Sequence, residues 1–214
     1  TSGSGYSNLG GLGPHATAPQ QAIRFAGVGT LDTGGSLDLI VRATSSYTAS
    51  NAGLNGVNDG NFGVINVAAG TSVDLVFEFV DSTSGSRVIV PQFDFSFYDL
   101  DQKIDGSQRE ELTVSGFEMF AVTEETEVAI DIPSEGGVAT FGSSTYGTGN
   151  DNPSDPVSMT QLQRDRSVEF TFKDTSSFEV TFTVTGSGRG RNFLFAGTSF
   201  YLPMCLDPPP LPPP

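Results

Sequence analysis

A stretch near the middle of the chain carries the side chains most able to do chemistry. Four carboxylates fall within twelve residues: Asp99, Asp101, Asp105 and Glu110. Carboxylate oxygens at such short spacing are ligands that calcium prefers, so the stretch predicts calcium as a candidate cofactor. It is not an EF-hand, because Lys103 and Ile104 stand where that loop needs an oxygen ligand and a glycine.

A second acidic loop, at residues 149–156, would complete such a site. It offers Asp151, Asn152 and Asp155 as further oxygen ligands. The alternative is an acidic turn, in which the aspartates cap backbone N–H groups and pair with Lys103 or Arg109. The sequence leaves both interpretations open.

Side chains for other chemistry are scarce. The single histidine, His15, lies in a segment rich in Gly and Pro, so a catalytic triad has no base in the folded body. HExxH and GxSxG motifs do not occur, and zinc would lack histidine and cysteine ligands. Two carboxylates would suffice for a glycosidase, but no E-x-D-x-x-E run is present. We therefore predict a protein that is not an enzyme.

Charge and composition limit the partners. The 214-residue chain has ten Lys and Arg against twenty-five Asp and Glu, a net charge of −15, which repels nucleic acid and anionic membranes. No apolar run approaches the ~18 residues needed to span a bilayer. Abundant Gly, Ser, Thr and Asp indicate an extracellular or cell-surface protein, and a lone Cys205 excludes an intrachain disulfide. With no initiator Met and no signal peptide, the chain is expected to be processed or partial.

The elements that must position these residues are β-strands. Apolar residues alternate with polar ones through residues 73–80, 93–98, 168–173 and 178–184, as in strands with one buried face. Weaker strands are predicted at Ala22–Phe25, Leu37–Ala43, Phe62–Val67, Arg87–Val90, Glu111–Ser115, Val128–Ile132, Val138–Phe141 and Asn192–Tyr201.

No segment has helical periodicity, and turn clusters separate the strands. The pattern predicts an all-β fold, a two-sheet antiparallel β-sandwich of jelly-roll type with no substantial helix. Residues 186–190, though rich in glycine, have no helix behind them and are predicted to form a hairpin turn. Five phenylalanines are predicted in the core: Phe77, Phe95, Phe170, Phe182 and Phe195.

The two ends differ from the body in composition. Residues 1–20 are predicted to be a Gly/Ser-rich arm, residues 21–206 the domain, and residues 207–214 a polyproline II tail. The tail would be either a spacer to another domain or a strut that docks on a neighbouring copy. In the second case the assembly contacts would be Pro208, Pro209, Pro210 and Leu211.

Three segments carry a family resemblance: Phe97–Phe117, Ser144–Pro156 and Gly190–Phe195. Together they resemble uncharacterised secreted β-sandwich modules of aquatic microalgae, over residues 21–202, and this family implies no reaction. The proline-rich end is also similar to subunits of glycosylated extracellular fibrils, whose β domains join head to tail. That resemblance implies O-linked glycans on modified prolines at Pro208, Pro209, Pro210, Pro212, Pro213 and Pro214.

The sequence therefore favours a structural subunit of an extracellular glycosylated fibril or cell-surface appendage, with other copies of itself as partner. A non-closing head-to-tail contact would generate such a filament. The alternative is a calcium-dependent carbohydrate-binding or adhesion module, for which exposed aromatics beside the acidic loop, such as Tyr98 and Tyr146, would be the mark. A glycan-active enzyme is the third hypothesis.

Overall fold

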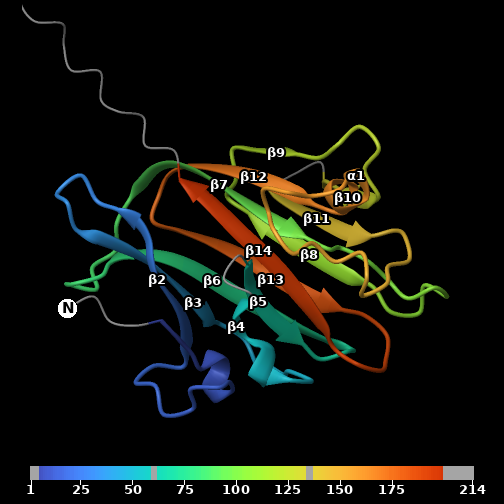
Figure 1. Ribbon diagram of the computed structural model, residues 1–214, viewed down its shortest axis with the longest axis horizontal. Helices are drawn as coiled ribbons and strands as arrows, with labels where there is room; N and C mark the ends of the chain where they lie inside the picture. The colour runs from blue at the N-terminus through green and yellow to red at the C-terminus, as the bar shows by residue number, and fades with distance from the viewer. Residues whose placement is uncertain (1–4, 59–61, 134–136, 200–214) are drawn as a thin grey trace, which may run out of the picture.

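Two antiparallel β-sheets pack face to face in the computed structural model, which describes residues 5–58, 62–133 and 137–199 (Figure 1). The eight-stranded sheet has the order β1 (Tyr6–Ser7), β2 (Ala22–Thr30), β3 (Ser36–Ala43), β6 (Thr71–Asp81), β13 (Ser177–Val184), β8 (Glu110–Ser115), β11 (Val138–Ser143) and β10 (Val128–Asp131). The six-stranded sheet has the order β4 (Gly56–Asn58), β5 (Phe62–Val67), β14 (Arg191–Ser199), β7 (Val90–Tyr98), β12 (Val168–Thr175) and β9 (Met119–Ala121). The predicted all-β sandwich is confirmed.

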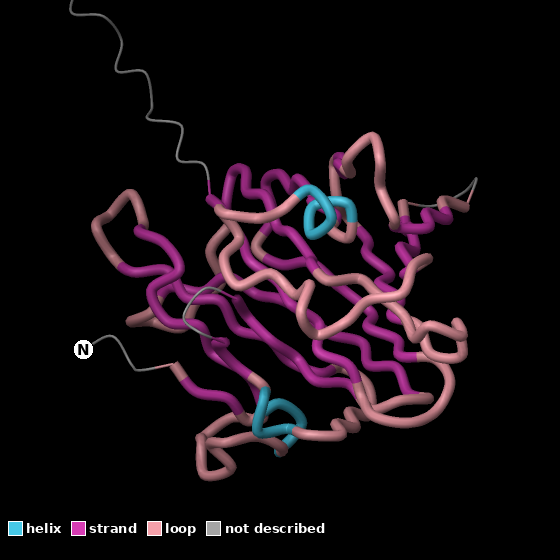
Figure 2. The backbone as a smooth tube through the Cα atoms, turned by 45° about the vertical axis from the view of Figure 1, so that its right-hand side comes forward, coloured by secondary structure: helices cyan, strands magenta, loops and turns pink. Residues whose placement is uncertain are grey.

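Helix is confined to short pieces at opposite ends of the described molecule (Figure 2). They are α1 (Gln161–Asp165) and two 3₁₀ turns, at Leu9–Gly11 and Ala52–Leu54. Helix α1 begins with a capping box, in which Thr160 Oγ1 accepts from the Gln163 N–H and the Gln163 side chain accepts from the Thr160 N–H. These pieces connect strands and cover little of either sheet.

Phenylalanine rings fill the space between the sheets. All five predicted core residues are at most 2% exposed. Phe77 on β6 contacts Phe95 and Phe195 of the opposite sheet edge-to-face, at centroid distances of 5.4 Å each, and stacks on Phe178 at 4.8 Å. Because side chains alternate along a strand, one row of each central strand enters this core and the other stays outside.

Two predicted elements are corrected. Residues 87–90 do not form a strand, because Arg87 makes a single bridge to Val80 before the chain crosses to the other sheet, where β7 begins at Val90. Residues 186–190 are a turn but not a hairpin, since they join β13 and β14, which lie in different sheets. The positive φ of Gly186, 71°, lets the backbone approach the Ser107 carbonyl too closely for any Cβ.

Residues 5–20, which were predicted to belong to a Gly/Ser-rich arm outside the domain, pack onto the sandwich. Strand β1 pairs with β2, and Leu9 is fully buried in the core. His15 helps to hold this segment, because its Nδ1 accepts from the Ser7 N–H at 3.0 Å. The prediction was based on the Gly/Ser-rich composition, which does not show that a single buried residue, Leu9, anchors this segment to the core. The predicted tail at residues 207–214 and Cys205 lie outside the described residues.

Candidate functional site

Four of the six predicted metal ligands come together at one end of the sandwich. The Asp101 N–H donates to Glu110 Oε2 at 3.1 Å, and Asp101 Oδ1 accepts from Arg191 Nη1 at 2.6 Å. The Asp101 and Asp151 carboxylates lie close enough to Asp99 to raise its pKa, and Asp151 also raises the pKa of Asp101. Arg166 and Arg191, which pair with Asp151 and Asp101, were not among the residues predicted from the sequence. We call Asp99, Asp101, Glu110, Asp151, Glu127, Arg166 and Arg191 the carboxylate–arginine cluster.

Arg166 is the central cation of this cluster. Its side chain is 7% exposed; Nη1 donates to Asp151 Oδ2 at 2.6 Å and Nε donates to Glu127 Oε2 at 2.7 Å. Its Nη2 also donates to the Tyr146 carbonyl at 2.8 Å. Helix α1 positions Arg166, because Gln163 Nε2 within it donates to the Asp151 carbonyl at 3.0 Å and ties the helix to that loop. The sequence offered one signal for this arginine: the chain has only ten Lys and Arg against twenty-five Asp and Glu, so each cation is a candidate partner for the carboxylates.

The two other predicted ligands face elsewhere. Asp105 is exposed, and its Oδ1 accepts from the Ser107 N–H at 3.0 Å and the Ser107 hydroxyl at 2.7 Å. Asp155 Oδ1 accepts from the Val157 N–H at 2.9 Å. Both aspartates therefore cap turns, as the alternative interpretation predicts. Among the residues that the structure describes, no three or more His, Cys, Asp and Glu side chains are arranged to hold a metal ion.

Burial controls protonation inside the cluster. Desolvation, reinforced by the Asp101 and Asp151 carboxylates, raises the pKa of Asp99 from 3.8 to about 8. Asp99 also has a φ of 63°, which is uncommon for a residue other than glycine. Desolvation likewise raises the pKa of Glu110 well above its ordinary value, with Asp101 and Asp99 adding to the rise. A pKa of about 8 keeps the Asp99 carboxyl protonated at neutral pH.

A pH dependence of stability follows. Between the ordinary pKa of 3.8 and about 8, folded Asp99 binds more protons than the unfolded chain does, so its contribution to stability falls as pH rises through this window. We expect Asp99→Asn to flatten the decline in melting temperature across these pH values, because an amide needs no proton. Scanning calorimetry at several pH values measures this, with Asp155→Asn as the control. An equal slope in the Asp99→Asn variant and the wild type would contradict the assignment.

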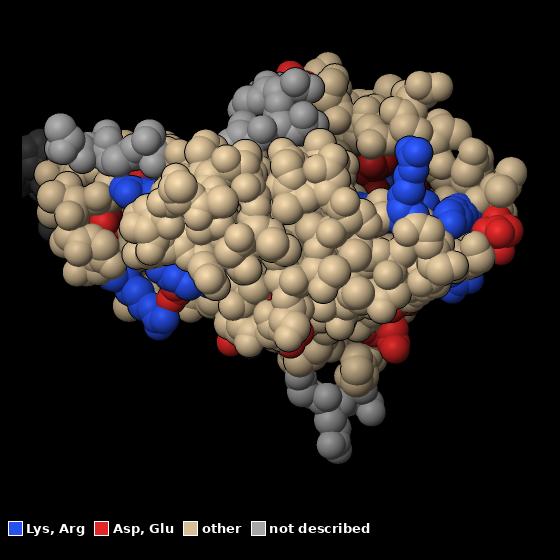
Figure 3. Space-filling view, turned by 90° about the horizontal axis from the view of Figure 1, so that it is seen from below, with Lys and Arg blue, Asp and Glu red and all other residues tan. Residues whose placement is uncertain are grey.

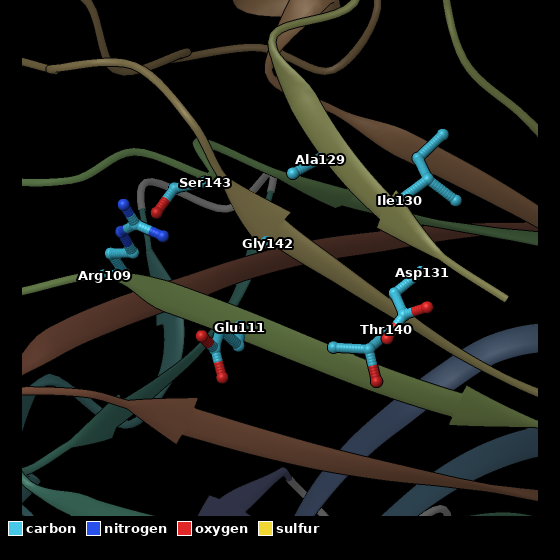
Figure 4. Close-up of a pocket in the computed structure, with 8 residues that line it drawn as sticks. All are labelled: Arg109, Glu111, Ala129, Ile130, Asp131, Thr140, Gly142 and Ser143. Atoms are coloured by element: carbon cyan, nitrogen blue, oxygen red, sulfur yellow. The ribbon is translucent and has the colours of Figure 1, made fainter. Parts of the chain in front are cut away.

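A groove lies on the outer face of the eight-stranded sheet, with a volume of about 340 Å³ (Figure 4). It is lined by Arg109, Glu111, Ala129, Ile130, Asp131, Thr140, Gly142 and Ser143. The hollow exists because Gly142 on β11 pairs with Ala129 on β10, and these two small residues form its floor. Glu111 pairs with Gly142 from the other side. A Cβ at Gly142 would come no nearer to another side chain than 3.7 Å, from Glu111 Cγ.

A row of polar side chains crosses the sheet beside the groove. Cross-strand pairing places one residue from each of five neighbouring strands in line: Asp74, Thr181, Thr113, Thr140 and Asp131. We call this set the threonine row. Thr181 Oγ1 donates to Asp74 Oδ1 at 2.7 Å, and the Thr113 and Thr140 hydroxyls are 2.9 Å apart. None of the five side chains is buried.

A second, smaller hollow of about 150 Å³ adjoins the row, and its lining includes Asp74, Thr113, Glu179 and Thr181. Carboxylates accept hydrogen bonds, hydroxyls donate and accept them, and the Arg109 guanidinium donates. The face can thus bind a ligand rich in hydroxyl or amino groups. Of the two tyrosines predicted to be exposed at a carbohydrate site, only Tyr146 is exposed, at 46%. Tyr98 is buried against Phe62.

Charged side chains are distributed unevenly on the surface. The view from below shows a broad face of uncharged residues, with Lys and Arg toward its two ends and Asp and Glu at the ends and along one edge (Figure 3). Among the described residues, 43–58 and 62–73 contain none of these four residue types. In the part of the chain that the structure describes, no helix is long and apolar enough to cross a membrane.

Comparison with known proteins identifies no family. No protein-family model and no curated protein matches the chain. Among solved structures, it is similar to the N-terminal domain of the Streptococcus gordonii adhesin Sgo0707, with a TM-score of 0.51 and 10% identity over 81% of this chain and 45% of that chain. This chain thus spans less than half of that structure, and the likeness shows a shared fold.

Two further solved structures match at lower TM-scores. The adhesin domain of PrgB from Enterococcus faecalis, bound to DNA, has a TM-score of 0.41 and 14% identity over 81% of this chain and 66% of that chain. The glucan binding protein C of Streptococcus mutans has a TM-score of 0.46 and 12% identity over 84% of this chain and 61% of that chain. The sequence-based resemblance to microalgal modules stays a prediction.

Proposed function

We propose that this chain is an adhesion-type module of an extracellular surface protein, which binds carbohydrate through the groove and catalyses no reaction. The observation that carries the proposal is the groove itself, a preformed hollow on an otherwise regular sheet face. Its volume of about 340 Å³ falls at the lower end of the range for small-ligand sites. The similar fold of Sgo0707 belongs to an adhesin, which supports the same class of function.

The lining of the groove suits a sugar. Glu111 and Asp131 offer carboxylate oxygens to ligand hydroxyls, while Arg109 offers donors from the rim (Figure 4). Ala129 and Gly142 leave a floor without polar side chains, against which the C–H face of a pyranose ring can lie. Phosphate-bearing ligands such as nucleic acid fit poorly, because two carboxylates would face them.

Gly142→Leu is expected to abolish binding by filling the groove. The substitution adds no backbone strain, because φ at Gly142 is not positive and the nearest side-chain atom to a Cβ is 3.7 Å away. Wild type and variant would be compared on a printed array of oligosaccharides, and we expect the bound signal of the variant to fall by about tenfold or more.

Gly149→Leu is the matched control, because an added Cβ there would meet nothing within 4 Å. Unchanged binding by the Gly142→Leu variant would place the ligand elsewhere. Absence of binding by the wild type to every glycan on the array would end the proposal.

Calcium dependence remains part of this proposal. Asp99, Asp101 and Asp151 offer carboxylates near one another, but Arg166 and Arg191 already pair with two of them. A calcium ion would therefore have to displace an arginine or recruit backbone carbonyls and water. Repeating the array with chelator and with millimolar calcium tests this, since equal binding in both would remove calcium from the proposal.

A fibril subunit is the second candidate function. The observation that favours it is the open edge of the eight-stranded sheet at β10, where Ile130 is 38% exposed and the adjoining Ile132 is 56% exposed. An exposed edge accepts an additional strand. The proposed tail contacts lie outside the described residues, so deletion of residues 207–214 followed by negative-stain microscopy is the direct test. Filaments that persist after the deletion would exclude the tail from assembly.

A further inference from the structure

We propose that the ligand is a linear β-linked polysaccharide that carries amino groups and lies along the threonine row, and not a single terminal sugar. This inference rests on the proposed function and names its substrate class. Two features of the face carry it, the length and direction of the row and the imbalance of its charges.

The row continues the groove across the sheet. Thr140 and Asp131 line the groove, while Thr113, Thr181 and Asp74 line the second hollow. The hydroxyls of Thr113 and Thr140, 2.9 Å apart, form the boundary between the two hollows. A ligand bound in the groove would therefore meet polar side chains without interruption if it extended toward Asp74.

The spacing of the row matches a linear sugar chain. Neighbouring strands are about 4.8 Å apart, so the four steps from Asp131 to Asp74 cover roughly 19 Å. One step is close to the length of one pyranose in an extended β-1,4-linked chain. Such a chain is a straight, flat ribbon, so successive residues would each meet a new strand. A coiled α-linked chain would leave the row after one or two residues.

The negative charge of this face favours a polysaccharide that carries positive charge. Asp74, Glu111, Asp131 and Glu179 line the two hollows, against a single cation, Arg109. Among the described residues, none of these four carboxylates forms an ion pair with Lys or Arg. Ammonium groups repeated along a polysaccharide would neutralise them, whereas uronic or sulfated chains would be repelled.

Calorimetric titration with β-1,4-linked glucosamine oligomers tests the inference at about pH 6. We expect the hexamer to bind about tenfold or more tightly than the dimer, because only the hexamer reaches from the groove to the far hollow. The N-acetylglucosamine hexamer, which has the same length and linkage without the charge, should bind more weakly. Added salt should weaken binding of the glucosamine hexamer in particular.

Glu179→Gln probes the second hollow, which Glu179 lines from β13, and should weaken binding of the glucosamine hexamer while leaving binding of the dimer unchanged. Glu118→Gln is the matched control, because Glu118 is 59% exposed, lines neither hollow and pairs only distantly with Lys173. Its affinities should equal those of the wild type.

The outcomes separate this inference from the proposed function. Equal affinity for dimer and hexamer, or equal affinity for the charged and acetylated hexamers, overturns the inference. If the array still reports glycan binding that depends on Gly142, the proposed function stands without it. No binding on either the array or the titration overturns both.

Discussion

Replacing Phe77 with alanine should lower the free energy of unfolding by about 3–5 kcal/mol. Phe77 is fully buried, and its ring contacts Phe95 and Phe195 from the opposite sheet and Phe178 from its own. Removing the ring opens a cavity that these rings, held by paired strands, cannot close. Urea unfolding followed by circular dichroism gives the difference in free energy.

Tyr146→Ala serves as the control for Phe77→Ala, since it also truncates an aromatic ring but at a site that is 46% exposed. We expect this control to cost less than about 1 kcal/mol. If both substitutions cost the same, the rings between the sheets would contribute less than their burial implies, and the assignment of inner and outer faces would have to be revised.

Arg166→Met should cost about 3 kcal/mol of stability, the lower end of the range for breaking a buried ion pair. The substitution keeps the length of the apolar stem but removes the guanidinium, which leaves Asp151 and Glu127 without their cation. Both carboxylates keep some contact with water, at 19% and 29% exposure, and this moderates the loss. Chemical unfolding of the variant at neutral pH measures it.

Arg164→Met is the matched comparison, two residues earlier in the chain. Arg164 is exposed, and its guanidinium donates to the Met159 carbonyl and to Gln161 Oε1 without joining the cluster. Its loss should change stability by less than about 0.5–1 kcal/mol. A cost at Arg166 no larger than at Arg164 would mean that the cluster does not depend on its central arginine.

Alternation along single strands is what the sequence by itself determined. It predicted an all-β sandwich, and it predicted burial of Phe77, Phe95, Phe170, Phe182 and Phe195, because a side chain's face follows from its position in its own strand. The close spacing of carboxylates in two acidic segments, and not alternation, placed Asp99, Asp101, Glu110 and Asp151 among the candidate residues. Short elements such as β1, β4 and β9 escaped prediction, since two or three residues are too few to show a period.

Only the tertiary structure decided which strands are neighbours, and the candidate site depends on that. Thr113, Thr140 and Thr181 are separated by 27 and 41 residues along the chain, and strand order alone brings them into one row. Arg166, at the end of helix α1, and Arg191, at the start of β14, reach the carboxylates only when the chain is packed. The pKa of Asp99 likewise depends on burial and on charges distant in sequence. Strand pairing and burial are non-local, because they minimise the free energy of the whole packed chain and not of any one segment.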